Sequence, residues 1–218
     1  MWLTNSSVGR KVVMSITGLF LILFLTFHVL MNAVALISLD AYEAVCEFLG
    51  ANWYALLGTA ILAGGFILHI IYAFWLTLQN RKARGENSYE VSSKPASVEW
   101  ASQNMLVLGI IVLCFLVLHF AQFWAKMQLP EMLGDYPATG KDALELAFGQ
   151  LWVAPVYIIG FIALWFHITH GFWSALQSLG TTNDVWIERF KCIGWWWATI
   201  VILLFIVEAC YFTWFFAL

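Results

Sequence analysis

Five long stretches that lack Asp, Glu, Lys and Arg, or nearly lack them, constrain what this chain can fold into. Four of them span 12–39, 48–80, 100–125 and 146–183, and the fifth, 192–218, contains only Glu208. A helix needs about 20 apolar residues to cross a bilayer. Since 62% of the residues are hydrophobic and 11% are charged, we predict an all-α integral membrane bundle of five transmembrane helices that forms one domain over residues 1–218.

Basic residues are unevenly distributed over the segments between these runs. Cytoplasmic loops of membrane proteins carry an excess of Lys and Arg. With the N-terminus in the cytoplasm, only two of the ten basic residues, Lys126 and Lys141, lie outside. We therefore expect a cytoplasmic N-terminus and an outer C-terminus. The basic residues then on the cytoplasmic side are Arg10, Lys11, Arg81, Lys82, Arg84, Lys94, Arg189 and Lys191.

Three of the connecting segments have a distinct character. The polar segment 81–99 lies on the expected cytoplasmic side, where we expect it to form a binding surface for a soluble partner. The acidic segment 40–50 lies outside and is predicted to form a short interfacial helix. In the outer segment 126–145 we expect turns, which are marked by Pro130, Gly134, Pro137 and Gly140.

One histidine lies deep inside each of the first four runs, where an ionisable group is costly and is a functional candidate by default. Counting helix rise from the expected cytoplasmic boundary places His28 at about 25 Å and His119 at about 30 Å. The same count places His69 at about 18 Å and His167 at roughly 15–20 Å. The sequence therefore predicts two pairs at two depths, His28 with His119 and His69 with His167.

Two imidazoles from different helices at one level suit a haem better than zinc or copper, which usually gather three or four ligands. Two axial histidines occupy both open positions of a haem iron, and such a haem serves electron transfer. No CxxCH motif is present, so the haems are expected to be non-covalent, of b type. The alternative is a haem-free membrane protein whose histidines form hydrogen bonds between helices.

Three further features leave alternatives open. His170 follows His167 by three residues and could compete for ligation, donate to a haem propionate or bond to a neighbouring helix. Glu208 is expected to be paired or to reach the membrane surface, in preference to a proton-relay role. Four glycines lie near the depth of the opposite histidine pair, where either a porphyrin or plain helix packing explains them. These are Gly18, Gly58, Gly109 and Gly160.

Four segments resemble the five-helix dihaem cytochrome b subunit that anchors succinate dehydrogenases and menaquinol:fumarate reductases. They are SITGLFLILFLTFH, ILHIIYAFW, VLHFAQFW and FHITHGFWSALQSLG. The resemblance implies that His28 and His119 bind the distal haem and that His69 and His167 bind the proximal one. A glycine four residues after the ligand, here Gly171, favours His167 over His170.

The resemblance also implies roles for other residues. Ser15 matches a position near a haem propionate. Glu47 is the nearest candidate for the acidic residue of the first outer loop that lies near the quinol and could accept its proton, and Glu43 is the next; for either, a solvated loop charge is the favoured interpretation. Trp165 stands where well-studied members have a glutamate that serves transmembrane proton transfer.

The resemblance predicts a redox subunit in a bacterial inner membrane with two haems b and menaquinol or menaquinone as substrate. Its partners would be an iron–sulfur subunit and a FAD-containing flavoprotein on the cytoplasmic side, in a complex that could dimerise and binds no nucleic acid. The expected reaction is menaquinol oxidation coupled to fumarate reduction. The alternatives are succinate oxidation by the same parts, or a dihaem cytochrome b that anchors a hydrogenase or formate dehydrogenase.

Overall fold

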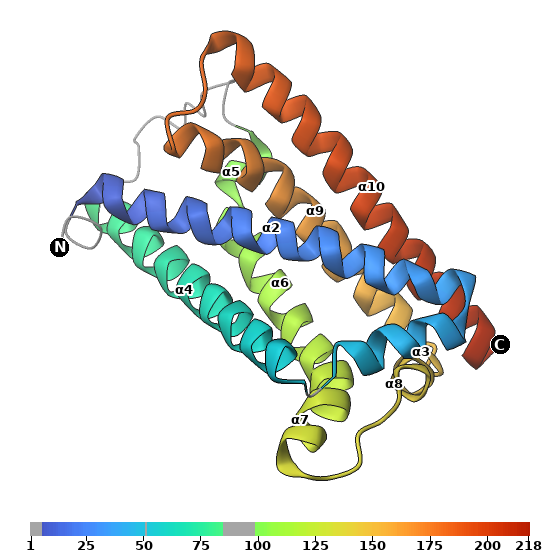
Figure 1. Cartoon of the computed structure of the whole chain (residues 1–218). Helices are drawn as coiled ribbons and strands as arrows, with labels where there is room; N and C mark the ends of the chain where they lie inside the picture. The colour runs from blue at the N-terminus through green and yellow to red at the C-terminus, as the bar shows by residue number, and fades with distance from the viewer. Residues whose placement is uncertain (1–5, 51, 85–98) are drawn as a thin grey trace.

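The computed structural model of the chain describes residues 6–50, 52–84 and 99–218. These ranges form helices joined by short connections, and no β-strand occurs within them (Figure 1). The expected all-α architecture is therefore confirmed. The helices, in chain order, are α2 (Ser7–Ile37), α3 (Leu39–Phe48), α4 (Trp53–Arg84), α5 (Trp100–Gln103), α6 (Met105–His119), the π-helix η1 (Phe120–Trp124), α7 (Ala125–Leu133), α8 (Gly140–Phe148), α9 (Val153–Ser178) and α10 (Asp184–Ala217).

Within the described ranges, five helical segments are long and apolar enough to cross a membrane. They are α2, α4, the continuous helix formed by α6, η1 and α7, α9, and α10, and each has between 26 and 34 residues. Each corresponds to one of the five uncharged runs of the sequence. These helices are compatible with a multi-pass membrane protein.

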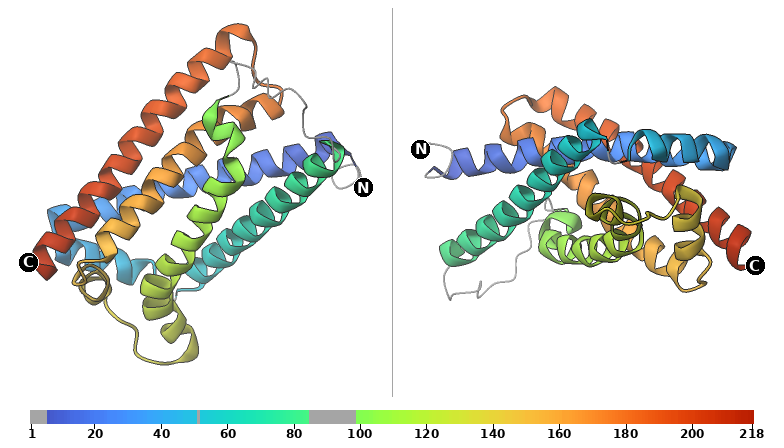
Figure 2. Two further views of the ribbon diagram at one scale, coloured as in Figure 1. Left: turned by 180° about the vertical axis from the view of Figure 1, so that it is seen from behind. Right: turned by 60° about the horizontal axis from the view of Figure 1, so that its bottom comes forward.

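The long helices form an open bundle around a shared interior. Packing contacts run from α4 to α2, from α2 to α9 and from α9 to α6, while α10 packs on α9 and α2. Figures 1 and 2 show α4 and α10 on opposite sides of the bundle, with α2 crossing one face. We call the end that carries α3, α7 and α8 the α8 end, and the end where α2 begins the N-terminal end.

Polar side chains define where the helices at the α8 end begin. Ser38 breaks the chain between α2 and α3 with an extended backbone, and its hydroxyl accepts from the Ala41 N–H at 3.2 Å. Thr139 and Asp142 form a reciprocal capping box at the start of α8. The predicted short helix in segment 40–50 is thus confirmed as α3. Of the predicted polar segment 81–99, residues 85–98 lie outside the described residues.

The prediction of turns throughout segment 126–145 is wrong for its first part. The third long helix continues to Leu133, with Pro130 inside α7, and it ends at Gly134, whose φ is 80°. A proline leaves the carbonyl four residues earlier without its helical donor. Here that carbonyl belongs to Lys126, and it accepts from the Ala138 N–H of the returning chain at 2.9 Å. The returning chain therefore satisfies the group that Pro130 releases.

The densely packed core lies toward the α8 end, where α2, α3, α8, α9 and α10 meet. Val153 and Phe212 are among its most completely buried side chains. On the facing helices, Phe115 of α6 packs against Gly160 of α9, where a Cβ would lie 2.6 Å from the Phe115 Cγ. Packing therefore explains Gly160, one of the four glycines for which the sequence left two explanations.

Candidate functional site

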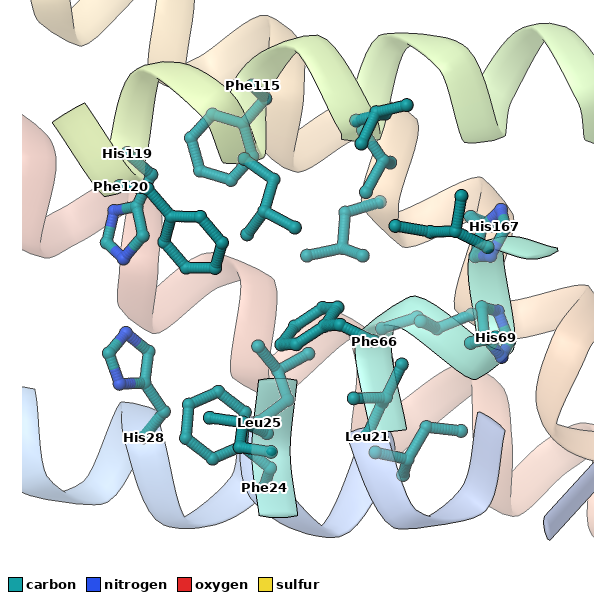
Figure 3. Close-up of a pocket in the computed structure, with 18 of the residues that line it drawn as sticks. Leu21, Phe24, Leu25, His28, Phe66, His69, Phe115, His119, Phe120 and His167 are labelled. Atoms are coloured by element: carbon teal, nitrogen blue, oxygen red, sulfur yellow. The ribbon is translucent and has the colours of Figure 1, made fainter. Parts of the chain in front are cut away.

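A cavity of about 1820 Å³ lies in the interior between α2, α4, α6 and α9. Its walls are mainly aliphatic and aromatic, and Figure 3 shows Leu21, Leu25, Phe66 and other apolar side chains between two pairs of histidines. Ligand pockets in proteins usually measure roughly 300–1,000 Å³. This interior is therefore large enough for two cofactor-sized ligands.

The four membrane histidines meet in two pairs inside this cavity (Figure 3). The ring centres of His28 and His119 are 5.7 Å apart, with planes at 88°. Those of His69 and His167 are 6.3 Å apart, with planes at 67°. The structure thus brings together the same two pairs that depth counting predicts, and their role as haem ligands stays a prediction.

The separation within each pair fits two imidazoles on opposite sides of one metal ion. A metal–imidazole bond is about 2.0 Å long and the bonded nitrogen lies about 1.1 Å from the ring centre, so two such rings have centres roughly 6 Å apart. The observed 5.7 and 6.3 Å bracket this value. Each level therefore presents a donor set suited to a metal whose remaining positions are filled by a macrocycle.

In each pair, one imidazole has an acceptor oxygen near Nδ1. The Thr17 hydroxyl donates to the Val13 carbonyl at 2.9 Å, and its oxygen lies 3.3 Å from Nδ1 of His69. The Tyr157 hydroxyl donates to Gln122 at 2.8 Å, and its oxygen lies 3.4 Å from Nδ1 of His119. An N–H on Nδ1 leaves the lone pair on Nε2, which is the tautomer a metal ligand needs.

The other two rings are held differently. Nδ1 of His28 lies 3.4 Å from the amide nitrogen of Asn32, which donates to the His28 carbonyl at 2.8 Å. Phe24 stacks on the His28 ring at 5.3 Å, and Phe205 of α10 lies 5.9 Å from it. Nδ1 of His167 is buried and has no hydrogen-bond partner among the described residues. The His28 ring is thus fixed mainly by aromatic packing.

Two of the four glycines lie directly beside the imidazoles of the His69–His167 pair. A Cβ on Gly18 would lie 3.4 Å from the His69 ring, and one on Gly109 would lie 3.7 Å from the His167 ring. Larger side chains at these positions would occupy the space next to the rings. A Cβ on Gly58 would have no described atom beyond its own stretch of helix within 4 Å, so neither explanation is favoured there.

The structure places Ser15 and His170 differently with respect to the cavity. Ser15 is 5% exposed and lies on the cavity wall, compatible with contact to a bound group. His170 also lines the cavity, but its Nδ1 lies 3.0 Å from the carboxylate of Glu99, next to α5. Of the three roles that the sequence left open for His170, a bond to a neighbouring element is the one observed.

The α8 end of the cavity has a polar mouth. Glu47, the candidate acceptor of a quinol proton, is exposed and lies on the cavity lining. Glu43 accepts from the backbone N–H groups of Gly140 and Lys141 at 3.2 and 3.1 Å, so its carboxylate binds the start of α8. Glu47 therefore remains available to a ligand, whereas Glu43 serves to join α3 to α8.

Polar contacts near the α8-end pair were not predicted from the sequence. The Gln128 side chain accepts from Thr59 at 2.9 Å and from Trp124 at 2.8 Å, joining α4 to the helix that follows His119. That helix is locally a π-helix from Phe120 to Trp124. Such π-bulges are frequent at functional sites, but the sequence carries no signal that fixes the bulge.

Glu208 lies inside the protein, contrary to the expectation that it is paired or reaches the surface. Only 7% of the residue is exposed, it lines the cavity, and its Oε1 has no hydrogen-bond partner among the described residues. Trp165 points elsewhere, donating to the Thr199 hydroxyl of α10 at 3.0 Å. The sequence marks Glu208 as unusual because it is the one carboxylate in an otherwise uncharged run. The direction in which its side chain points depends on how α10 packs.

Comparison of the chain with protein-family models, with curated proteins and with solved structures found no match.

Proposed function

We propose that this chain is the membrane-anchoring, quinone-reactive dihaem cytochrome b subunit of a menaquinol:fumarate oxidoreductase in a bacterial inner membrane. The observation that carries the proposal is the meeting of four histidines from four helices as two facing pairs at two levels of one apolar cavity. The cavity volume and the ring separations fit two b-type haems, each held between two imidazoles.

The residues of the chain divide the work around such haems. When bound, two six-coordinate haems would supply one-electron transfer between the two levels. The four histidines would hold the irons, and Thr17 and Tyr157 would keep His69 and His119 in the ligand tautomer. The aliphatic and aromatic walls would exclude water and lower the local polarity, which tunes the potentials of metal centres.

The N-terminal end suits contact with soluble partners. The start of α2, the last residues of α4 and the start of α10 lie toward this end, and they carry basic residues such as Arg10, Arg81 and Arg189. The excess of basic residues favours a cytoplasmic location for this end, by the positive-inside rule. The proposal therefore puts the iron–sulfur subunit and the FAD flavoprotein on this side, next to the level of His69 and His167.

The α8 end suits quinol oxidation. Its cavity mouth has hydrogen-bonding groups from α4 and α7, Thr59 and Gln128, and the exposed carboxylate of Glu47. A quinol headgroup needs donors and acceptors next to apolar walls, and this mouth combines both. Menaquinol would thus give up electrons next to His28 and His119, at the opposite end from the soluble subunits.

Three alternatives are separated by simple observations. The first alternative is the same subunit working in succinate oxidation with menaquinone reduction. The direction depends on the redox potentials of the haems and substrates, and measured rates in both directions distinguish it from fumarate reduction. A dihaem cytochrome b of a hydrogenase or formate dehydrogenase would have a nickel- or molybdenum-containing partner. A haem-free membrane protein with histidines as interhelical links is disfavoured by the cavity, because an apolar interior of this size leaves its walls without packing partners.

The experiment that tests the proposal is purification of the native complex in mild detergent. Its partners are identified by mass spectrometry, and menaquinol oxidation with fumarate and menaquinone reduction with succinate are both measured. The proposal expects a covalent or tightly bound flavin, iron–sulfur clusters and a fumarate- or succinate-dependent rate. Co-purification with a nickel or molybdenum subunit, or a complex inactive with both dicarboxylates, would reject it.

A further inference from the structure

Glu208 is a buried carboxyl group that the function proposed above does not use. It lies on α10, three residues beyond Phe205, and residues at this spacing share one face of a helix. The Phe205 ring lies 5.9 Å from the His28 ring. Glu208 therefore lies one helical turn from the level of the His28–His119 pair, toward the α8 end, and on the cavity wall.

A carboxyl group in this position is costly to the fold. It is 7% exposed, and its Oε1 has no hydrogen-bond partner among the described residues. Buried polar groups in proteins are nearly always hydrogen-bonded, and ionisable groups within membrane helices are rare unless they serve a function. Glu208 lines the cavity, is buried and has an oxygen without a hydrogen-bond partner among the described residues, as expected for a group that binds a ligand or a proton.

The titratable groups around Glu208 come from three elements. Tyr42 of α3 is close enough for its ionisation to be coupled electrostatically to Glu208, and it interacts with the thiol of Cys46. Burial raises the pKa of Tyr42 well above its ordinary value and that of Cys46 to about 11. His28 of α2 and Tyr157 of α9 line the same cavity. Neither the phenol of Tyr42 nor the thiol of Cys46 forms a cation at any pH, so neither can hold Glu208 in an ion pair.

The cavity connects Glu208 to the α8-end mouth. Glu43, Glu47 and Glu131 line the same cavity as Glu208. Glu47 is exposed, and an exposed carboxylate exchanges protons readily with water, so a proton on Glu208 has an acceptor toward the outside.

We propose that Glu208 accepts the protons of a hydroquinone bound at the α8 end of the cavity and passes them to the carboxylates of the mouth. This inference rests on the proposed function. Oxidation of the hydroquinone would release two protons and two electrons, and the electrons would leave one at a time through the haem that His28 and His119 would hold. For each proton, a hydroquinone O–H bond breaks and an O–H bond forms on the Glu208 carboxylate. Release of that proton to Glu47 or water restores the carboxylate.

The test compares Glu208→Gln and Glu208→Asp with the control Glu145→Gln in the purified complex. Glu145 lies on α8 at the same end of the bundle, but its side chain is exposed and does not line the cavity. Turnover with a menaquinol analogue, haem content and the redox-induced infrared difference spectrum are measured on each. The infrared spectrum reports protonation of a carboxylic acid directly and does not depend on turnover.

We expect Glu208→Gln to lose about 100-fold or more of turnover, the usual effect of removing a positioned acid–base group. It should keep both haems, and it should lack a carboxylic-acid band that the wild type shows when its redox state changes. Glu208→Asp should retain part of the rate with a shifted band, and Glu145→Gln should match the wild type.

A Glu208→Gln complex that has both haems and at least half the wild-type turnover would overturn the inference. Where the Gln variant fails to assemble, the wild-type and Asp spectra decide, because absence of a redox-linked carboxyl band in both would also overturn it. Failure of the proposed function looks different, since the wild-type complex itself would then lack haem or quinol activity.

Discussion

The hydroxyl of Thr17 makes contacts that set it apart from other hydroxyls of α2. It donates to carbonyls of its own helix and offers its oxygen to Nδ1 of His69 at 3.3 Å. Thr26 of the same helix also donates to a helix carbonyl, that of Ile22, at 3.0 Å. Both threonines therefore donate to a backbone carbonyl of their own helix. Thr17 in addition contacts an imidazole.

Thr17→Val should weaken haem binding at the His69–His167 level. Loss of a group that orients a metal ligand usually costs 10–100-fold in metal affinity. Titration of haem into the haem-depleted protein, with the potential of each haem followed separately, checks this. Thr26→Val is the matched control and should leave both haems unchanged. Equal effects of the two substitutions would show that Thr17 acts only through its helix.

Cys46 gives a pH-dependent prediction on α3. Burial raises the pKa of its thiol from 9.0 to about 11, and only the thiolate reacts with alkylating agents. At pH 8 the folded protein should therefore be alkylated at Cys46 about 100-fold more slowly than the denatured protein, as measured by mass spectrometry. Equal rates in the two states would contradict the buried position of this thiol.

The same shift has a definite sign for stability. Between pH 9 and 11 the unfolded chain loses the Cys46 proton while the folded chain keeps it. Folding is then linked to proton binding, so the stability of α3 packing should fall as pH rises through this window. The raised pKa of Tyr42 acts in the same direction.

The long helices were largely predictable because each uncharged run in the sequence is long enough to cross a membrane and marks the extent of one helix. The error at Pro130 arose because a distant N–H, that of Ala138, satisfies the carbonyl that proline releases. The histidine pairs were predictable because helix rise converts sequence position into depth. Which way Glu208 and Tyr157 point depends on the rotation of each helix about its axis, and long apolar helices give almost no periodic signal for that rotation.

Contact between α6 and α9 gives a prediction at the scale of helices. In Gly160→Ala, the new Cβ would lie 2.6 Å from Phe115, which also packs against His119 at 6.0 Å. Overpacking of this kind costs about 1–3 kcal/mol, and it should lower the thermal stability of the protein and disturb the α8-end haem. Circular dichroism during heating and the haem spectrum measure both effects.

Gly58→Ala is the matched control on α4, where the new Cβ would have no described atom beyond its own stretch of helix within 4 Å. It should be neutral or slightly stabilising, since alanine favours a helix over glycine by about 1 kcal/mol. Adding Phe115→Leu to Gly160→Ala should recover much of the lost stability. Full stability of Gly160→Ala alone would mean that α6 and α9 are not in the close contact seen here.

On the scale of the whole molecule, the two ends of the bundle differ in chemistry. The N-terminal end carries basic residues, and the α8 end carries carboxylates and the short helices α3 and α8. With five crossings and the N-terminal end in the cytoplasm, a periplasm-dependent alkaline phosphatase should be active when fused after Pro137 or Leu218 and inactive after Arg84. The reverse pattern would invert the proposed placement of the soluble partners and the quinol.

The most direct test of the central claim is the haem content and spin state of the purified chain from haem-replete cells. The account predicts two low-spin, bis-histidine haems b per chain by haemochrome assay and electron paramagnetic resonance. His28→Ala and His69→Ala should each lose the haem of its own level, while His170→Gln keeps both. One haem per chain, a high-spin five-coordinate spectrum or a colourless protein would contradict it.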